Sequence, residues 1–120
     1  MTTYRDLEIQ QGADVAIELH CETDSGSTKD LTNYTITAYA KRAYTDSASD
    51  PNTVQFNAIV ANPSTDGIAT LSLTNSQTDS LITRGRYVYD VEASYVDSDG
   101  DTIVERILEG QITVSPSATK

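Results

Sequence analysis

Apolar and polar residues alternate along several short segments of this chain, and residues 85–95 form the clearest of them. One parity holds Tyr87, Tyr89, Val91, Ala93 and Tyr95, and the other holds Asp90, Glu92 and Ser94. A period of two is typical of a strand with one buried and one solvated face. About six or seven such segments, separated by turn residues, predict an all-β fold: an antiparallel β-sandwich of two sheets.

The apolar parity of each segment predicts the core. Its members are expected to include Ile17, Leu19, Ile36, Phe56, Leu71, Tyr87, Val91 and Ile112. Between two of the strands, residues 75–82 are expected to form one short helical turn that crosses between the sheets, with Asn75 or Ser76 as its N-cap.

The last segment, residues 102–114, keeps no single parity, because Ile103 and Ile107 disagree with Val104 and Leu108. A bulge near residues 105–106, or a bend at Gly110, would reconcile them. This segment and the first strand, residues 7–10, are the predicted edge strands that pair with a partner chain.

Length and charge exclude several classes of protein. The 120 residues fit one domain, residues 1–115, followed by a flexible tail, residues 116–120. A net charge of −10 argues against partners such as nucleic acid or anionic membrane. Cys21 is the only cysteine, so no intrachain disulfide forms, and its parity predicts a buried thiol. No signal peptide or membrane span is visible, which indicates folding in a reducing cytoplasm.

Few residues suggest chemistry. His20, the only histidine, falls on the solvated parity of its strand, so neither an enzyme nor a bound cofactor is expected. Asp97, Asp99 and Asp101 have the alternate spacing of a calcium loop, but Leu108 stands where the EF-hand carries its chelating glutamate. An ordinary acidic hairpin turn is therefore preferred, with no metal, and the three carboxylates remain a weak metal candidate.

Several residues are candidates for contact with a partner. Tyrosine offers a large contact area at low entropic cost, and Tyr39 lies on the solvated parity of its strand, although covering the sheet's own face is an equal possibility. The long loop at residues 45–53 is the expected contact tip. The candidate contact residues are Leu7, Ile9, Tyr39, Tyr44, Ser49, Asp50 and Asn52.

Residues 81–89 resemble the entry to strand F of immunoglobulin-like domains. Leu81, Gly85, Tyr87 and Tyr89 carry the likeness. The resemblance implies an immunoglobulin-like sandwich in which Tyr87 is the tyrosine corner and Tyr89 stands where antibody domains carry a cysteine. Because that cysteine and the partnering tryptophan are missing, a secreted immunoglobulin domain is not expected.

The order of five further segments resembles small phage tail and baseplate modules, such as the N-terminal domain of the baseplate upper protein. The matching segments are residues 9–14, 30–34, 67–74, 85–91 and 110–114. The resemblance implies a virion structural protein that docks by its surface and has no catalytic residues. In the resembled protein a longer receptor-carrying part follows the domain, so direct host recognition by this chain is not expected.

The function expected from these features is that of a non-enzymatic structural protein of a tailed bacteriophage particle. It would be assembled in the host cytoplasm and would act as a docking adaptor in the baseplate, neck or tail-fibre attachment region. Other virion proteins would be its partners, and it would be present as a homo-oligomer or in multiple copies on a ring or lattice. A capsid decoration protein is the first alternative, and a carbohydrate- or surface-binding module is the second.

Overall fold

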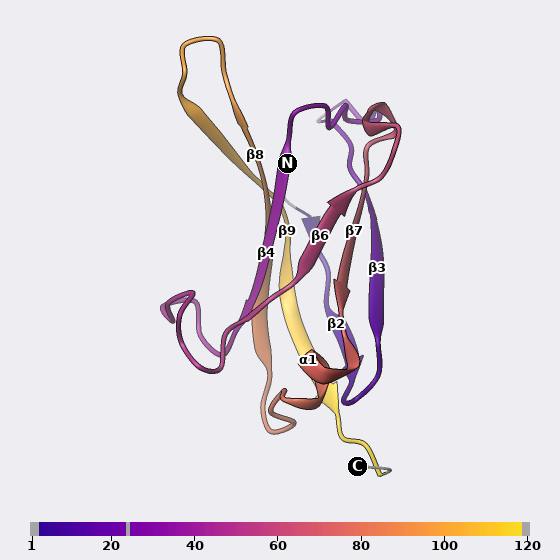
Figure 1. Ribbon diagram of the computed structural model, residues 1–120, viewed down its shortest axis with the longest axis vertical. Helices are drawn as coiled ribbons and strands as arrows, with labels where there is room; N and C mark the ends of the chain where they lie inside the picture. Colours follow the sequence, from indigo (N-terminus) through magenta and orange to yellow (C-terminus); the bar gives the residue numbers. More distant parts are fainter. Residues whose placement is uncertain (1–2, 24, 119–120) are drawn as a thin grey trace.

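The structure is a computed structural model that describes residues 3–23 and 25–118. It is a sandwich of two sheets, as the alternation predicts (Figure 1). Sheet A contains β1 (Thr3–Tyr4), β2 (Leu7–Gln10), β4 (Thr35–Lys41), β5 (Val54–Gln55), β8 (Tyr87–Val96) and β9 (Thr102–Ser115). Sheet B contains β3 (Val15–His20), β6 (Asn57–Val60) and β7 (Ile68–Leu73). Of the predicted tail, residues 119–120 lie outside the described residues.

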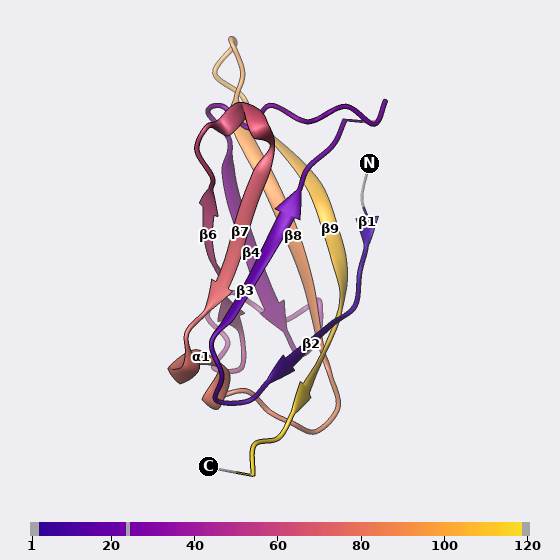
Figure 2. The same cartoon turned by 90° about the vertical axis from the view of Figure 1, so that its right-hand side faces the viewer.

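The strands β1 and β2 both pair with β9, in parallel, as Figure 2 shows along the side of the sandwich. Residues 108–112 therefore have a neighbour on each side, β8 on one and the first strands on the other. The sequence predicts that all of residues 102–114 form an edge of the sheet, and this prediction is wrong for residues 108–112. The first strand does lie at the edge of sheet A, as predicted.

The chain changes sheets at Phe56. Val54, Phe56, Ala58 and Val60 share one parity, which predicts a single strand over residues 54–60. In the structure, β5 pairs with β4 in sheet A and β6 pairs with β7 in sheet B. Phe56 lies between them with only 3% of its surface exposed, and its amide donates to the Ala38 carbonyl (2.9 Å). Its buried ring is one reason for the split, because it anchors the crossing point in the core.

The predicted helical turn is α1 (Asn75–Asp79), which joins β7 to β8 and so crosses between the sheets. Its N-cap is Thr74, one residue before the predicted position. The Thr74 hydroxyl accepts from the Gln77 amide, and the Gln77 side chain accepts from the Thr74 amide, which is a capping box. A second turn, η1 (Ser64–Asp66), lies in the loop between β6 and β7, where the sequence suggests only a turn.

The predicted core is confirmed, with Ile17 half-buried and the other seven residues buried. Cys21 is also buried, and burial raises the pKa of its thiol. At the tyrosine corner, the Tyr87 hydroxyl accepts a hydrogen bond from the Ile82 amide (2.9 Å). The Tyr89 hydroxyl donates to the Arg5 carbonyl, so two inward tyrosines of one strand tie down two separate loop segments.

The irregular parity of the last strand is resolved by a bulge at Ile107. Val91 pairs with Leu108, but the next residue, Glu92, pairs with Arg106. The bulge is one residue from the predicted position. Because it reverses the alternation, Arg106 turns to the outer face of the sheet while Leu108 points into the core.

Candidate partner-contact face

The outer face of sheet A carries a row of four side chains that come from four different strands. The row is set by strand register, in which Tyr4 pairs with Glu109, Glu109 with Asp90, and Asp90 with Tyr39. Residues in register share one face, and neighbouring strands lie about 4.8 Å apart, so the two tyrosines stand roughly 14 Å apart. The row therefore places an aromatic ring at each end and two carboxylates between them.

Arg106 offsets part of the negative charge at the centre of this row. Its guanidinium lies 3.4 Å from the Asp90 carboxylate and 3.3 Å from the Glu109 carboxylate. Both ion pairs depend on the bulge at Ile107, which directs Arg106 outward. The resulting surface combines tyrosine and arginine, the residue types that most often dominate binding energy at protein interfaces.

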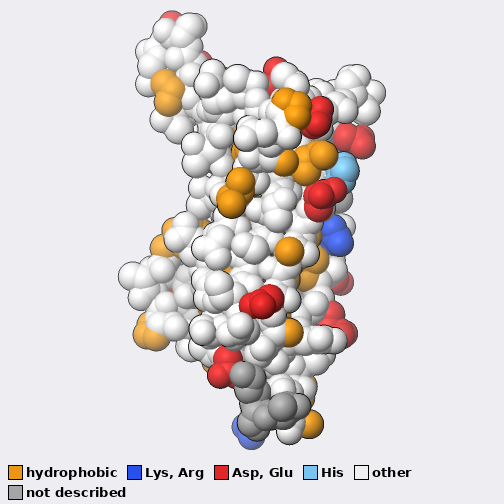
Figure 3. Space-filling model, turned by 45° about the vertical axis from the view of Figure 1, so that its right-hand side comes forward, with side chains coloured by type: hydrophobic (Ala, Val, Ile, Leu, Met, Phe, Trp, Pro, Cys, Tyr) orange, Lys and Arg blue, Asp and Glu red, His pale blue; other side chains and the backbone are white. Residues whose placement is uncertain are grey.

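Two projections flank the row. In Figure 1 the tip of the β8–β9 hairpin and the loop at residues 42–53 both extend to the left, away from sheet B. Figure 3 shows both as bulges on one side of the molecule with a recess between them. The hairpin carries Val96 and Val104, which are 66% and 53% exposed, and the loop carries Tyr44, which is 60% exposed. The face is consequently hollowed and has apolar groups at both rims.

Tyr4 and Tyr44 lie near each other on this face. Partial desolvation, the Asp6 carboxylate and the Tyr44 phenol all raise the pKa of Tyr4. Tyr39 is half-buried, and the Lys41 ammonium lies 5.8 Å from the centre of its ring. Of the predicted contact residues, Tyr39 and Tyr44 therefore belong to one surface, and the sequence prediction missed Tyr4 and Arg106.

The loop at residues 42–53 is held by its own hydrogen bonds. The Asp50 carboxylate accepts from the Asn52 amide (2.8 Å), and the Thr53 hydroxyl donates to the Ser47 carbonyl (2.8 Å). Ser49 and Asn52 are exposed, whereas Asp50 is half-buried because it braces the turn. An internally braced loop loses little conformational freedom on binding, which favours a contact role.

The two predicted contact residues of the first strand lie elsewhere. Ile9 is 1% exposed and belongs to the core, and Leu7 is half-buried and packs against it. The prediction is therefore corrected for the Ile9 side chain, which has no access to a partner. The parallel pairing of β2 with β9 is the reason, because it turns this parity inward.

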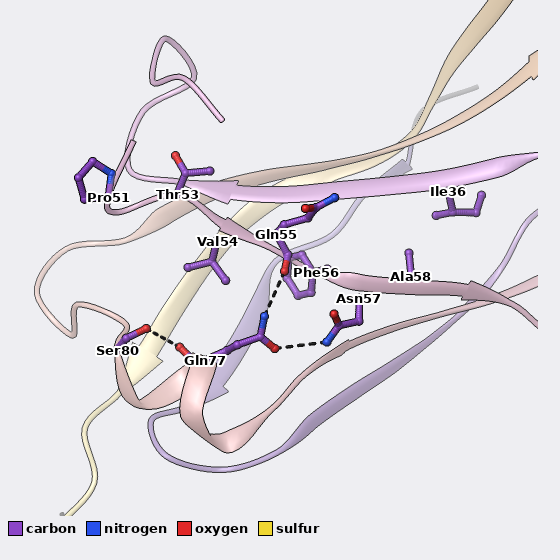
Figure 4. A pocket seen from close by; sticks show the side chains of 10 residues that line it. All are labelled: Ile36, Pro51, Thr53, Val54, Gln55, Phe56, Asn57, Ala58, Gln77 and Ser80. Carbon is purple, nitrogen blue, oxygen red and sulfur yellow. Dashed lines mark hydrogen bonds between the residues drawn. The ribbon is translucent and has the colours of Figure 1, made fainter. Parts of the chain in front are cut away.

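A pocket of about 550 Å³ lies beneath the loop at residues 42–53, and Figure 4 shows its lining. Gln77 projects toward its floor, where the side chain donates to the Gln55 carbonyl (3.4 Å) and accepts from the Asn57 amide group (3.3 Å). The same Gln77 side chain completes the capping box. The polar atoms of the Gln77 side chain are therefore engaged in holding the fold.

The acidic hairpin tip is organised by one of its own carboxylates. Asp97 Oδ1 accepts from the amides of Asp99 (3.0 Å) and Asp101 (2.9 Å). Among residues 3–23 and 25–118, no three His, Cys, Asp or Glu side chains lie together in a way that could hold a metal ion. His20 is exposed and bonds to Glu18 (2.7 Å). No helix in the described part of the chain is long and apolar enough to cross a membrane.

Comparison with known proteins places the fold and nothing further. No protein-family model and no curated protein matches the chain. A solved structure of murine CRIg is similar over 92% of both chains, with 14% sequence identity and a TM-score of 0.51. The fold is immunoglobulin-like. Since 222 solved chains match, the fold alone does not indicate a function.

Proposed function

We propose that this protein is a non-enzymatic docking module of a tailed-phage particle and that it docks through the outer face of sheet A. The observation that carries the proposal is the row from Tyr4 to Tyr39, with Arg106 at its centre and a projection at each rim. The phage setting is supported by the order of the five segments that resemble tail and baseplate modules. The baseplate, neck and tail-fibre attachment region are the sites where such an adaptor acts.

Three features support docking through this face. Tyrosine side chains bury a large apolar area while keeping a polar hydroxyl at the rim. In the Asp90–Arg106–Glu109 cluster the charges are held in place by ion pairs within the chain. Charges at fixed positions favour one specific register with a binding partner. The braced loop and the hairpin provide walls that a flat sheet lacks.

The proposal is tested by incorporation into particles. Particles assembled with the Tyr4→Ser, Tyr39→Ser double variant should contain at least about tenfold less of this protein than wild-type particles, because two buried tyrosine contacts are lost. Ile59→Ser is the matched control: Ile59 is 67% exposed but lies on the outer face of sheet B. Quantitative mass spectrometry of purified particles measures the copy number. Equal loss in both variants, or absence of the wild-type protein from particles, overturns the proposal.

A capsid decoration protein remains the first alternative, because a docking face suits a head lattice as well as a tail. Electron microscopy of particles with labelled protein separates the two. Label on the tail or neck supports the adaptor, and label spread over the head supports the decoration protein.

A carbohydrate- or surface-binding module is the second alternative, favoured by the exposed tyrosines of the same face. Tyr4 and Tyr44 are each 60% exposed, and Tyr4 and Tyr39 flank the carboxylates of Glu109 and Asp90. Screening on a glycan array tests it. If the protein binds a glycan, and if this binding is lost in Tyr39→Ser and kept in Ile59→Ser, the face recognises a sugar. Sugar recognition would then take the place of the proposed docking to a virion protein.

A further inference from the structure

Among the residues that the structure describes, none forms a strand beside the outer edge of β3 in sheet B. The order of this sheet is β3, β7, β6, and the first strands of the chain pair with β9 instead of β3 (Figure 2). β3 has six residues, whereas the other described strands at sheet edges have two (β1 and β5) or four (β2 and β6). Neither a proline nor a bulge interrupts β3, so it lacks two of the devices that usually protect an edge.

The free edge presents the backbone of three residues. The Cys21 amide donates to the Gly67 carbonyl (2.7 Å), which continues the β3–β7 ladder through the odd-numbered residues. Antiparallel ladders alternate, so the N–H and C=O groups of Ala16, Glu18 and His20 point away from β7 toward the open edge. Their side chains stand exposed on the outer face of sheet B.

The space beside this edge is open as well. A groove of about 840 Å³ runs along the upper half of β3, between β3 and β9. Leu19 and Cys21 line it from one sheet, and Ile107 and Leu108 line it from the other. An added strand would cover part of these apolar groups while it satisfies the free backbone groups.

We infer that β3 pairs antiparallel with β3 of a second copy of this chain across a twofold axis, with Ile17 of one copy facing Ile17 of the other. The two three-stranded sheets then join into one continuous sheet. An isologous pairing of this kind uses one surface twice and closes after two copies. The inference goes beyond the proposed function and does not depend on the face of sheet A.

The charges along β3 favour this register over the two registers next to it. When the two sheets join, the inward-facing side chains of both copies must lie on the same side. Only registers that place odd-numbered residues of one copy opposite odd-numbered residues of the other meet this condition. With Ile17 on the axis, Glu18 faces Ala16 and His20 faces Asp14 of the other copy, and Asp14, Glu18 and His20 are all exposed. Moving the axis to Glu18 or to Ala16 places two acidic side chains opposite each other, which is destabilising.

The first test is the mass of the wild-type protein by sedimentation and light scattering up to millimolar concentration, with a dimer expected. Glu18→Pro removes an amide that points to the free edge and leaves the β3–β7 ladder intact. It should raise the dimer Kd about tenfold or more, because two intermolecular hydrogen bonds are lost. Glu18→Gln keeps the amide and is the matched control. A monomer at every concentration, or a dimer that tolerates Glu18→Pro, overturns the inference.

Two further pairs of variants keep the inference testable if Glu18→Pro fails to fold. His20→Lys should tighten the dimer and His20→Asp should weaken it, each about two- to tenfold, because residue 20 faces Asp14. In a Cys21→Ala background, Ile17→Cys should form a covalent dimer on oxidation. Residues 17 then form a non-hydrogen-bonded pair about 4.5 Å apart, within disulfide range.

Glu18→Cys in the same background should stay monomeric under denaturing conditions, because residue 18 faces Ala16. Crosslinking through residue 18 instead of residue 17 contradicts the register. The other possible occupant is a strand of a different protein, and an extended peptide of alternating valine and lysine tests it. If the chain is monomeric and binds this peptide with NMR shifts confined to Val15–His20, the occupant is a partner's strand. That result would overturn the pairing with a second copy.

Discussion

The carbonyl of Arg5 occupies the space in which a side chain on Gly110 would begin. The Arg5 amide donates to the Glu109 carbonyl (2.8 Å), so the first strand passes directly over β9 at this glycine. Tyr89 completes the contact, because its hydroxyl donates to the same carbonyl and its ring lies 3.1 Å from the missing β-carbon. The glycine is therefore required by the close approach of two strands.

Gly110→Ala is expected to destabilise the protein by about 1–3 kcal/mol, because the new methyl group displaces the Arg5 backbone or the whole β1 strand. Urea unfolding measures the loss, and hydrogen exchange should show a more rapidly exchanging Arg5 amide. Gly26→Ala is the control, since a β-carbon there meets nothing within 4 Å and only the positive φ of 85° is strained. A smaller cost for Gly110→Ala than for Gly26→Ala would contradict this account.

Tyr89 should make stability fall at alkaline pH. Burial raises the pKa of its phenol to about 12, whereas an unfolded tyrosine loses its proton near about pH 10. Between these values the folded state holds a proton that the unfolded state has lost. The stabilising contribution is complete below about pH 10 and falls by about 1.4 kcal/mol per pH unit up to about pH 12.

The measurement is the free energy of unfolding at several pH values for the wild type and for Tyr89→Phe. The other tyrosines titrate in both proteins, so the difference in slope isolates Tyr89. Parallel curves would show that burial of this phenol does not influence its ionisation.

Millimolar calcium should leave the melting temperature unchanged. One oxygen of Asp97 already accepts two backbone hydrogen bonds within the turn, so the carboxylate serves the hairpin itself. Asp97→Ala should loosen the hairpin at a cost of about 1 kcal/mol with or without calcium. A calcium-induced rise in melting temperature that disappears in Asp99→Ala would instead establish a metal site at Asp97, Asp99 and Asp101.

The capping box should make a measurable contribution to stability. Thr74→Ala is expected to cost about 1 kcal/mol, because the Gln77 amide loses its acceptor at the start of α1. Thr74→Ser should recover most of the loss, and Ser76→Ala, at an exposed position of the same helix, should change little. Chemical denaturation separates the three variants. Equal costs for Thr74→Ala and Ser76→Ala would mean that the cap does not stabilise the helix.

The candidate site was only partly predictable from the sequence. The parity of its strand correctly placed Tyr39 on the solvated face, and composition indicated the loop that carries Tyr44. Tyr4 and Arg106 escaped prediction because neither has a local signal. Tyr4 joins the row through parallel pairing with a strand about a hundred residues later, and Arg106 faces outward only because of the bulge at Ile107.

The sequence by itself determined which residues lie inside those strands that keep one clear alternation. Alternation is a local property of the backbone, so Ile36, Leu71 and Tyr87 could be assigned to the core without knowledge of their neighbours. The tyrosine corner could be recognised in the same way, because the bond from Ile82 to Tyr87 spans only a few residues.

Only the tertiary structure decided which strands are neighbours. Pairing joins segments far apart in the chain, and several pairings are compatible with the same alternation. The first strands pair in parallel with β9, and the close contact of Arg5 with Gly110 accompanies this pairing. Because these strands pair with β9 and not with β3, the edge of β3 stays open. The burial of Phe56 likewise accompanies the division of one predicted strand between two sheets, since its ring fills the core where the chain crosses.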